Sequence, residues 1–121
     1  MTRAALLLLL ALSACLEPCE YPAALVHYGT PAAGADEVIA RAAAICPSRI
    51  LGTITWTEAP FDCVGVLAAG CLDSVGPCGI DARVLRREPA TASALAHEIG
   101  HYCTGSPKEA DADDFAARVG P

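Results

Sequence analysis

The chain has 121 residues, which is enough for one domain, and its 14 Asp and Glu residues outnumber its 8 Lys and Arg residues, for a formal net charge of −6. This acidic balance argues against nucleic acid and against an anionic membrane surface as direct partners. Any contact with a membrane is therefore expected to come through an attached lipid.

The N-terminus resembles an export signal. Arg3 precedes an apolar run over residues 4–12, which is too short to span a bilayer as a helix. The tetrad Leu-Ser-Ala-Cys that ends at Cys15 is similar to the bacterial lipobox, in which the cysteine becomes the lipid-modified first residue. We therefore expect a lipoprotein signal peptide over residues 1–14, with an ordinary secretory signal as the alternative. Leu16, where an Asp would favour the inner membrane, slightly favours the outer membrane.

A tether over residues 15–22 is expected to lead into the domain at residue 23. Residues 23–28 fit a short strand, and residues 35–46 fit a helix that has two acidic residues in its first turn and a proline just past its end. Residues 50–57 alternate between apolar residues and threonine, which predicts a strand with one solvated face. Trp56 in this strand is expected in the core rather than in a substrate pocket.

Two further strands are predicted over residues 64–72 and 80–85, the first weakened by internal glycines. A helix is then expected at about residues 90–102, and a second helix begins near residue 106. One helix, two or three strands and a final pair of helices predict an α+β fold for a single domain over residues 23–121.

The first helix of that pair contains the pattern His97-Glu98-Ile99-Gly100-His101. Residues four apart lie on the same face of a helix, so His97 and His101 can offer two imidazole nitrogens to one metal ion. Glu98 lies about 100° further round the helix, where it is better placed as a general base than as a ligand. This is the zinc-peptidase arrangement, although the spacing alone can occur on any amphipathic helix.

The chain beyond this pattern separates two classes of zinc peptidase. The metzincin extension would need Gly at position 104 and His at position 107, and this chain has Thr104 and Pro107. A second helix is expected instead, with Ser106 as its N-cap and Pro107 as its first residue. Within this helix Glu109 and Asp113 lie on one face, because they are four residues apart.

The histidine pattern followed by Glu109-x-x-Ala-Asp113-x-Phe-Ala resembles the gluzincins, in particular the zinc helix of prenyl-protein and heat-shock membrane zinc peptidases and of minigluzincins. The resemblance covers about a quarter of the chain. It implies one Zn²⁺ per chain, held by His97, His101 and Glu109, with Asp113 supporting a ligand histidine. The sequence departs from thermolysin-like enzymes in that only seven residues separate His101 from Glu109.

Glu109 has a second interpretation. It is the third residue after Ser106, so it could be the N3 partner of a capping box, and a carboxylate engaged there is poorly placed to bind a metal. Asp111 or Asp113 would then replace it as a ligand. Asp113 could also be a solvated surface charge without a role at the metal.

Without residues 1–14 the chain has 107 residues (121 − 14) and six cysteines besides Cys15. An even number in a small exported domain predicts three disulfides, and the absence of a Cys-x-x-Cys pair disfavours a cysteine zinc site. A short loop closed by Cys71 and Cys78 is one option, and Cys103 is expected to tie the end of the metal helix to the body of the domain. The six candidates are Cys19, Cys46, Cys63, Cys71, Cys78 and Cys103.

These features predict a zinc-dependent peptidase of the bacterial cell envelope that hydrolyses peptide or protein substrates. Glu98 would take a proton from a metal-activated water and return it to the leaving amine. An exposed strand edge is expected to hold the substrate as an added strand. A donor to the developing oxyanion is also needed, and His27, Tyr28 and Tyr102 are candidates.

Two other functions remain open at this point. The first is a zinc-stabilised binding lipoprotein without turnover, although a structural zinc site has no need of a base at Glu98. The second is an envelope lipoprotein built on disulfides and without a metal. Metal content separates the second alternative from the other two.

The lipobox predicts that Cys15→Ser will release the protein from the membrane fraction or block its processing. Membrane fractionation of the wild-type protein and of Cys15→Ser, with mass spectrometry of the mature N-terminus, would measure this. An unmodified Cys15 in exported protein would contradict the prediction.

Overall fold

The computed structural model describes residues 24–76, 79–90 and 93–121. In chain order these residues form β1 (Leu25–Tyr28), α2 (Ala35–Ile45), β2 (Gly52–Thr57), β3 (Phe61–Cys63), β4 (Val66–Ala68), β5 (Gly70–Gly76), β6 (Gly79–Leu85), α3 (Ala94–Thr104) and α4 (Glu109–Val119). The predicted α+β class is confirmed. The predicted signal peptide, tether, lipid-bearing Cys15 and Leu16 lie outside the described residues.

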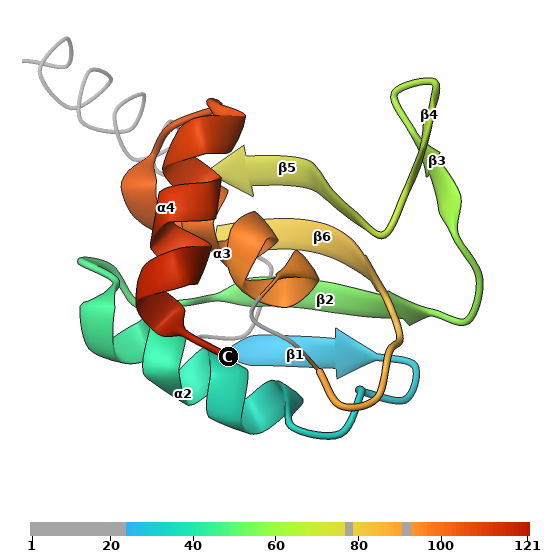
Figure 1. Ribbon diagram of the computed structural model, residues 1–121, viewed down its shortest axis with the longest axis horizontal. Coiled ribbons are helices and arrows are strands. Elements are labelled where there is room, and N and C mark those ends of the chain that lie inside the picture. The colour runs from blue at the N-terminus through green and yellow to red at the C-terminus, as the bar shows by residue number, and fades with distance from the viewer. Residues whose placement is uncertain (1–23, 77–78, 91–92) are drawn as a thin grey trace, which may run out of the picture.

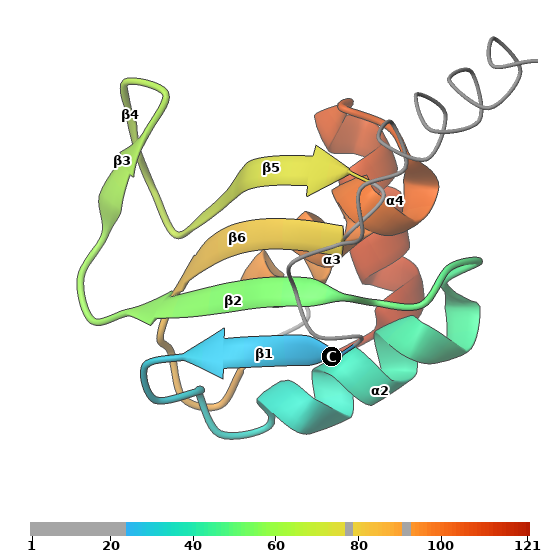
Figure 2. The same cartoon turned by 180° about the vertical axis from the view of Figure 1, so that it is seen from behind.

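Four strands form the main sheet in the order β1-β2-β6-β5. β1, β2 and β6 run parallel, and β5 is antiparallel to β6. Figures 1 and 2 show the three helices on one face of this sheet, with α4 lying outside α3. The order leaves β5 at one edge, paired with β6 alone among the described strands.

The alternation predicted for β2 decides which face is buried. Ile54 and Trp56 are almost fully buried beneath the helices, as are Ile80 and Val84 of the neighbouring β6. The threonines of β2 point to the opposite face, as expected for a strand of period two. Trp56 is therefore a core residue, as predicted, and its indole Nε1–H donates a hydrogen bond to Nδ1 of His27 at 2.9 Å.

The single strand predicted over residues 64–72 is wrong. The structure has a separate two-stranded hairpin, β3–β4, followed by β5 from Gly70. Val64 and Gly65 form the hairpin turn with φ of 51° and 82°, the left-handed conformation that a two-residue turn requires and that glycine adopts without strain. The glycines at positions 65 and 70 interrupt this apolar run, but the run has no alternation from which the turn could be placed.

Two disulfides lie within the described residues, Cys46–Cys103 and Cys63–Cys71. The first ties α3 to the end of α2, which confirms the expectation for Cys103. The second joins the hairpin to β5, because β3 brings Cys63 beside β5, so the option of a loop closed by Cys71 and Cys78 is not the one realised. Cys19 and Cys78 lie outside the described residues.

The two disulfides should stabilise the domain unequally. Cys46–Cys103 spans 57 residues and Cys63–Cys71 spans 8, so loop-closure entropy predicts losses of about 4 and about 2.5 kcal/mol when each pair is replaced by Ala. Urea unfolding followed by the fluorescence of Trp56, the only tryptophan, would measure both. A larger loss from the Cys63/Cys71 pair would contradict the prediction.

Candidate metal centre

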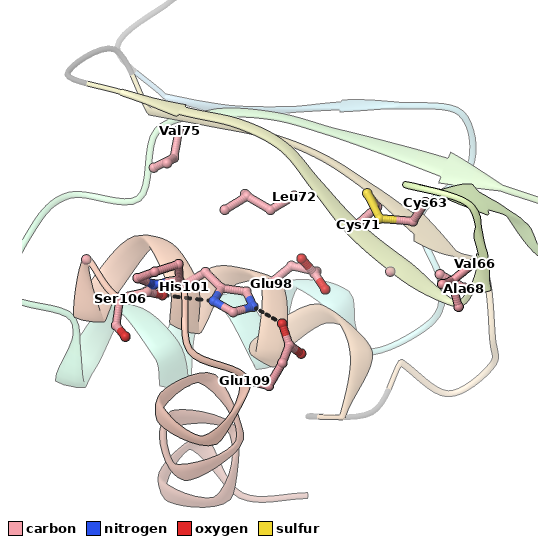
Figure 3. A pocket seen from close by; sticks show the side chains of 13 residues that line it. Cys63, Val66, Ala68, Cys71, Leu72, Val75, Glu98, His101, Ser106 and Glu109 are labelled. Atoms are coloured by element: carbon pink, nitrogen blue, oxygen red, sulfur yellow. Dashed lines mark hydrogen bonds and ion pairs between the residues drawn. A yellow bond between two sulfur atoms is a disulfide. The ribbon is translucent and has the colours of Figure 1, made fainter.

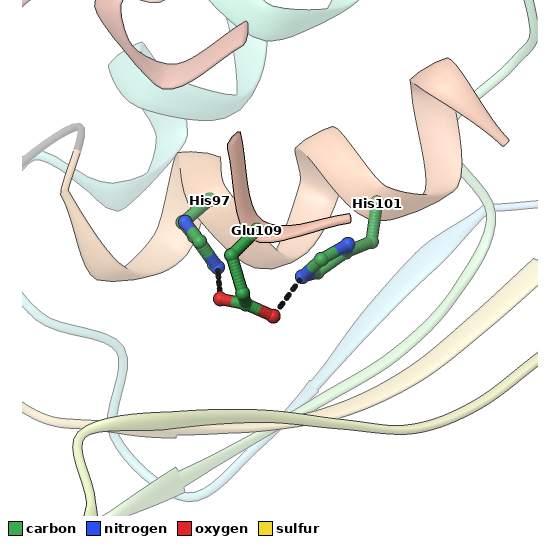
Figure 4. A group of neighbouring side chains, drawn as sticks. All are labelled: His97, His101 and Glu109. Atoms are coloured by element: carbon green, nitrogen blue, oxygen red, sulfur yellow. Dashed lines mark hydrogen bonds and ion pairs between the residues drawn. The ribbon is translucent and has the colours of Figure 1, made fainter. Parts of the chain in front are cut away.

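Three side chains from two helices converge in Figure 4. His97 and His101 lie one turn apart on α3, and Glu109 at the start of α4 lies between them. Oε2 of Glu109 is 2.7 Å from Nε2 of His97, and its Oε1 is 3.2 Å from Nε2 of His101. One ligand atom from each residue lies within 4.8 Å of the other two, so the trio could hold a metal ion.

The close approach of α3 and α4 makes this convergence feasible over a short connection. Gly105 ends α3 in the left-handed conformation with φ of 65° and turns the chain toward α4. Gly100 faces α4 directly, and a Cβ there would lie 3.1 Å from both the carbonyl oxygen of Ala112 and Cβ of Phe115. A side chain at position 100 would therefore require α4 to shift relative to α3, the packing that positions Glu109 against the histidines.

The second nitrogen of each histidine is held by a partner of its own. Nδ1 of His97 is 2.8 Å from Oδ1 of Asp113, and Nδ1 of His101 is 2.9 Å from the carbonyl oxygen of Ser106. A carbonyl oxygen only accepts, so Nδ1 of His101 carries the proton. In both rings Nδ1 is held in this way and Nε2 faces Glu109, and a partner on the second nitrogen is the usual arrangement around ligating histidines.

The charges around His97 alter its protonation. Burial alone would lower the pKa of His97, but hydrogen bonds to Asp113 and Glu109, together with the charge of Glu98, outweigh burial and raise the pKa above its usual value. The carboxylates around this ring therefore favour a positive charge at the site. A bound divalent cation would be stabilised by the same carboxylates.

Glu98 lies beside the trio but outside it. Glu98 is only 6% exposed. Burial raises the pKa of its carboxyl, although the charges of His97 and His101 act to lower that pKa. Gly70 of β5 leaves room for it, since a Cβ there would lie 3.1 Å from Cγ and Oε1 of Glu98. Glu98 is thus a buried carboxylate at the wall of a cavity, next to two histidines.

The capping interpretation of Glu109 does not match the contacts. α4 begins at Glu109, not at Pro107, and Ser106 uses its hydroxyl elsewhere. Oγ of Ser106 donates to a carboxylate oxygen of Asp111 at 2.5 Å and accepts from the backbone N–H of Lys108 at 3.2 Å. Asp111 is therefore engaged with Ser106, and Glu109 is left to face the histidines.

A cavity of about 630 Å³ opens in front of these residues. Glu98, His101 and Glu109 line one side of it, and Leu72 and Val75 of β5 line the other, as Figure 3 shows. This volume is within the range usual for ligand sites. The cavity therefore runs from His101 and Glu109 to β5, which is an edge strand of the sheet among the described residues.

None of the three residues considered as oxyanion donors lines this cavity. His27 and Tyr28 lie on β1, at the opposite edge of the sheet from β5. The hydroxyl of Tyr102 donates to the carbonyl oxygen of Arg49 at 2.6 Å. The ring of His27 accepts from Trp56, which makes it a structural histidine.

Sequence reasoning missed two glycines and one wall of the cavity. Gly70 and Gly100 are needed because other chain segments approach them, and no local pattern reports a close approach. The hairpin residues Cys63, Val66 and Ala68 also line the cavity. They could not be placed at the site from the sequence, because residues 64–72 were predicted to form one strand and not a hairpin.

Comparisons with protein-family models, with curated proteins and with solved structures found no match for this chain. Among the described residues, no helix has the length and apolar character needed to cross a bilayer.

The geometry predicts one tightly bound zinc per chain, lost in His97→Ala and strongly weakened in Glu109→Gln. Asp113→Asn should weaken binding by about 10–100-fold, because Asp113 orients a ligand ring. Asp114→Asn is the matched control, because Asp114 is an exposed carboxylate on the same helix, and it should bind as wild type does. Metal content of exported, dialysed protein and competition with a chelator would measure this.

Two outcomes would contradict this assignment in different ways. Zinc near zero in wild-type protein would remove the metal site altogether. Retention of zinc by Glu109→Gln, with loss in Asp111→Asn, would keep the site but replace its third ligand.

Proposed function

We propose that this chain is a zinc-dependent peptidase. The observation that carries the proposal is the position of Glu98, a buried carboxylate adjoining the His97–His101–Glu109 trio at the wall of one cavity. A structural metal site has no use for an acid–base group beside it. The His-Glu-x-x-His spacing adds support, because it provides two ligands and a base on one helix.

The donor set suits Zn²⁺. Two imidazole nitrogens and one carboxylate are the protein ligands of a catalytic zinc site, which keeps a further position open. When bound, zinc supplies a Lewis acid that polarises a carbonyl and lowers the pKa of a water ligand to about 7. Asp113 and the carbonyl of Ser106 hold the two rings by Nδ1, with Nε2 of each ring toward Glu109.

Glu98 is the residue proposed to move protons. Its carboxylate would accept a proton from the attacking water and deliver it to the leaving amine of the cleaved bond. Burial keeps this carboxylate away from bulk water, and the raised pKa of Glu98 brings it closer to the working range of a general base. Gly70 keeps the space that the carboxylate occupies.

The edge of β5 is proposed to bind the substrate backbone. β5 is paired on one side only among the described strands, and its residues line the cavity opposite the proposed ligands. An extended peptide added to this edge would place successive carbonyl groups along the cavity. The proposed setting is the bacterial cell envelope, with a lipid on Cys15, which the lipobox supports.

A zinc-stabilised binding protein is the second candidate. It is favoured by one observation: His27, Tyr28 and Tyr102 all lie outside the cavity, so no donor for an oxyanion has been assigned. Such a protein would bind peptides at the same edge without cleaving them.

Glu98→Gln separates the two candidates. The change preserves size while removing the base, so zinc content should stay near wild type while peptide cleavage falls by about 10²–10⁴-fold. The measurement is cleavage of a diverse peptide library by zinc-loaded protein, with a chelator control. Wild type that binds zinc and cleaves nothing would favour the binding protein, and a variant as fast as wild type would remove Glu98 from the mechanism.

A further inference from the structure

The β3–β4 hairpin carries an unusual concentration of exposed apolar side chains. Val64 is 95% exposed, Leu67 is 74% exposed and Val66 is 65% exposed, all within four consecutive residues. Adjacent exposed apolar residues on a small domain mark interaction sites more often than isolated ones do. In Figure 1 this hairpin projects from the sheet next to the beginning of β5.

The two faces of β4 have different surroundings. Val66 and Ala68 line the cavity that contains Glu98 and Glu109, whereas Leu67 between them does not. This follows from strand geometry, since successive side chains point to opposite faces. Figure 3 shows Val66 and Ala68 together at the rim of the cavity beneath the hairpin.

Two tethers hold the hairpin in this position. The Cys63–Cys71 disulfide joins the end of β3 to β5. Arg83 of β6 provides the second tether: its Nη1 donates to the carbonyl oxygen of Asp62 at 3.3 Å, and its guanidinium lies 4.6 Å from the centre of the Phe61 ring. Arg83 is itself fixed to Asp73 of β5 by two hydrogen bonds of 2.7 and 2.8 Å. The hairpin is therefore a fixed wall rather than a free arm.

We propose that the hairpin forms an apolar subsite for one side chain of the bound peptide, with Val66 as its specificity-determining residue. This inference rests on the proposed function, because it assumes that the backbone of the bound peptide runs along the edge of β5. A substrate side chain that points away from Glu98 and Glu109 would contact the apolar lining formed by Val66, Ala68 and Leu72. The substrate class is thus an extended peptide with a large aliphatic or aromatic residue next to the bond at the metal centre.

The position and charge of the hairpin favour a peptide over a lipid surface. Val66 is partly exposed but lines the cavity, on the other face of β4 from Leu67. Asp62 follows Phe61 on β3, and the whole chain carries a net charge of −6, which would repel an anionic bilayer. The cavity also continues from Val66 to Glu98 and His101, so a peptide bound at one end reaches the other.

The test measures binding rather than turnover. Full-length, zinc-loaded Glu98→Gln protein would be titrated against fluorescent seven-residue peptides that differ only in a central Leu, Phe or Ala, and anisotropy would give each Kd. Leu and Phe peptides should bind about tenfold more tightly than the Ala peptide, the discrimination typical of an apolar pocket. Val66→Ser should bring the ratio close to one, and Leu67→Ser, the matched control on the outer face, should keep it.

Two further variants keep the test decisive. Val66→Phe retains an apolar wall but fills the subsite, so preference should move to the Ala peptide. Replacing Cys63 and Cys71 by Ala removes the covalent one of the two tethers, and discrimination should fall while zinc content stays unchanged. Equal effects of Val66→Ser and Leu67→Ser, or no effect of either, would overturn the inference.

Failure of the inference and failure of the proposed function give different results. If wild type cleaves peptides but Val66→Ser leaves the Leu-to-Ala ratio unchanged, the subsite is wrong and the peptidase stands. If wild type cleaves nothing but Val66 still controls the ratio, the subsite stands in a binding protein. If the protein binds anionic vesicles, Leu67→Ser abolishes that binding and no peptide preference is seen, the subsite would be overturned in favour of a membrane contact.

Discussion

The contact between α3 and α4 is the constraint on which the site depends. A connection of four residues links the two helices, and Gly100 lets the backbone of Ala112 come close enough for Glu109 to reach both histidines. Any side chain at position 100 would meet atoms of α4 at about 3.1 Å. The two candidate ligands of α3 lie in one local stretch, but the position of the third candidate, Glu109, depends on how tightly the two helices pack.

The sequence predicted what is local and missed what depends on distant parts of the chain. The His97–His101 face and β2 follow from periods of 3.6 and 2, and both could be placed without coordinates. The turn at Val64 lies in an apolar run without a period, so its hairpin could not be placed. Glu109 could have capped its own helix or faced the histidines, and only packing against α3 separates these alternatives. The partner of Cys71 likewise depended on where the unpredicted hairpin lies.

The two disulfides fix different neighbours of the proposed site. Cys46–Cys103 joins the C-terminal end of α3, the helix that carries both histidines, to the end of α2, and Cys63–Cys71 joins the hairpin to β5. Cys63 and Cys71 themselves line the cavity, so their disulfide fixes one wall of the cavity to the sheet. Cys46–Cys103 instead fixes the helix that carries both candidate histidines, so each covalent link holds a separate part of the site in place.

The loop between α3 and α4 couples the geometry of the ligands to the backbone. His97 is oriented by a side chain, Asp113, whereas His101 is oriented by the carbonyl of Ser106, a group that no substitution at that position removes. Ser106 is in turn fixed by its hydroxyl, which bonds Asp111 and the N–H of Lys108. The loop that delivers Glu109 to the histidines is therefore the same loop that sets the ring of His101. A change in the conformation of this loop would move Glu109 and the ring of His101 together. The short connection therefore restricts where α4 can lie and keeps these two proposed ligands in a fixed relation to each other.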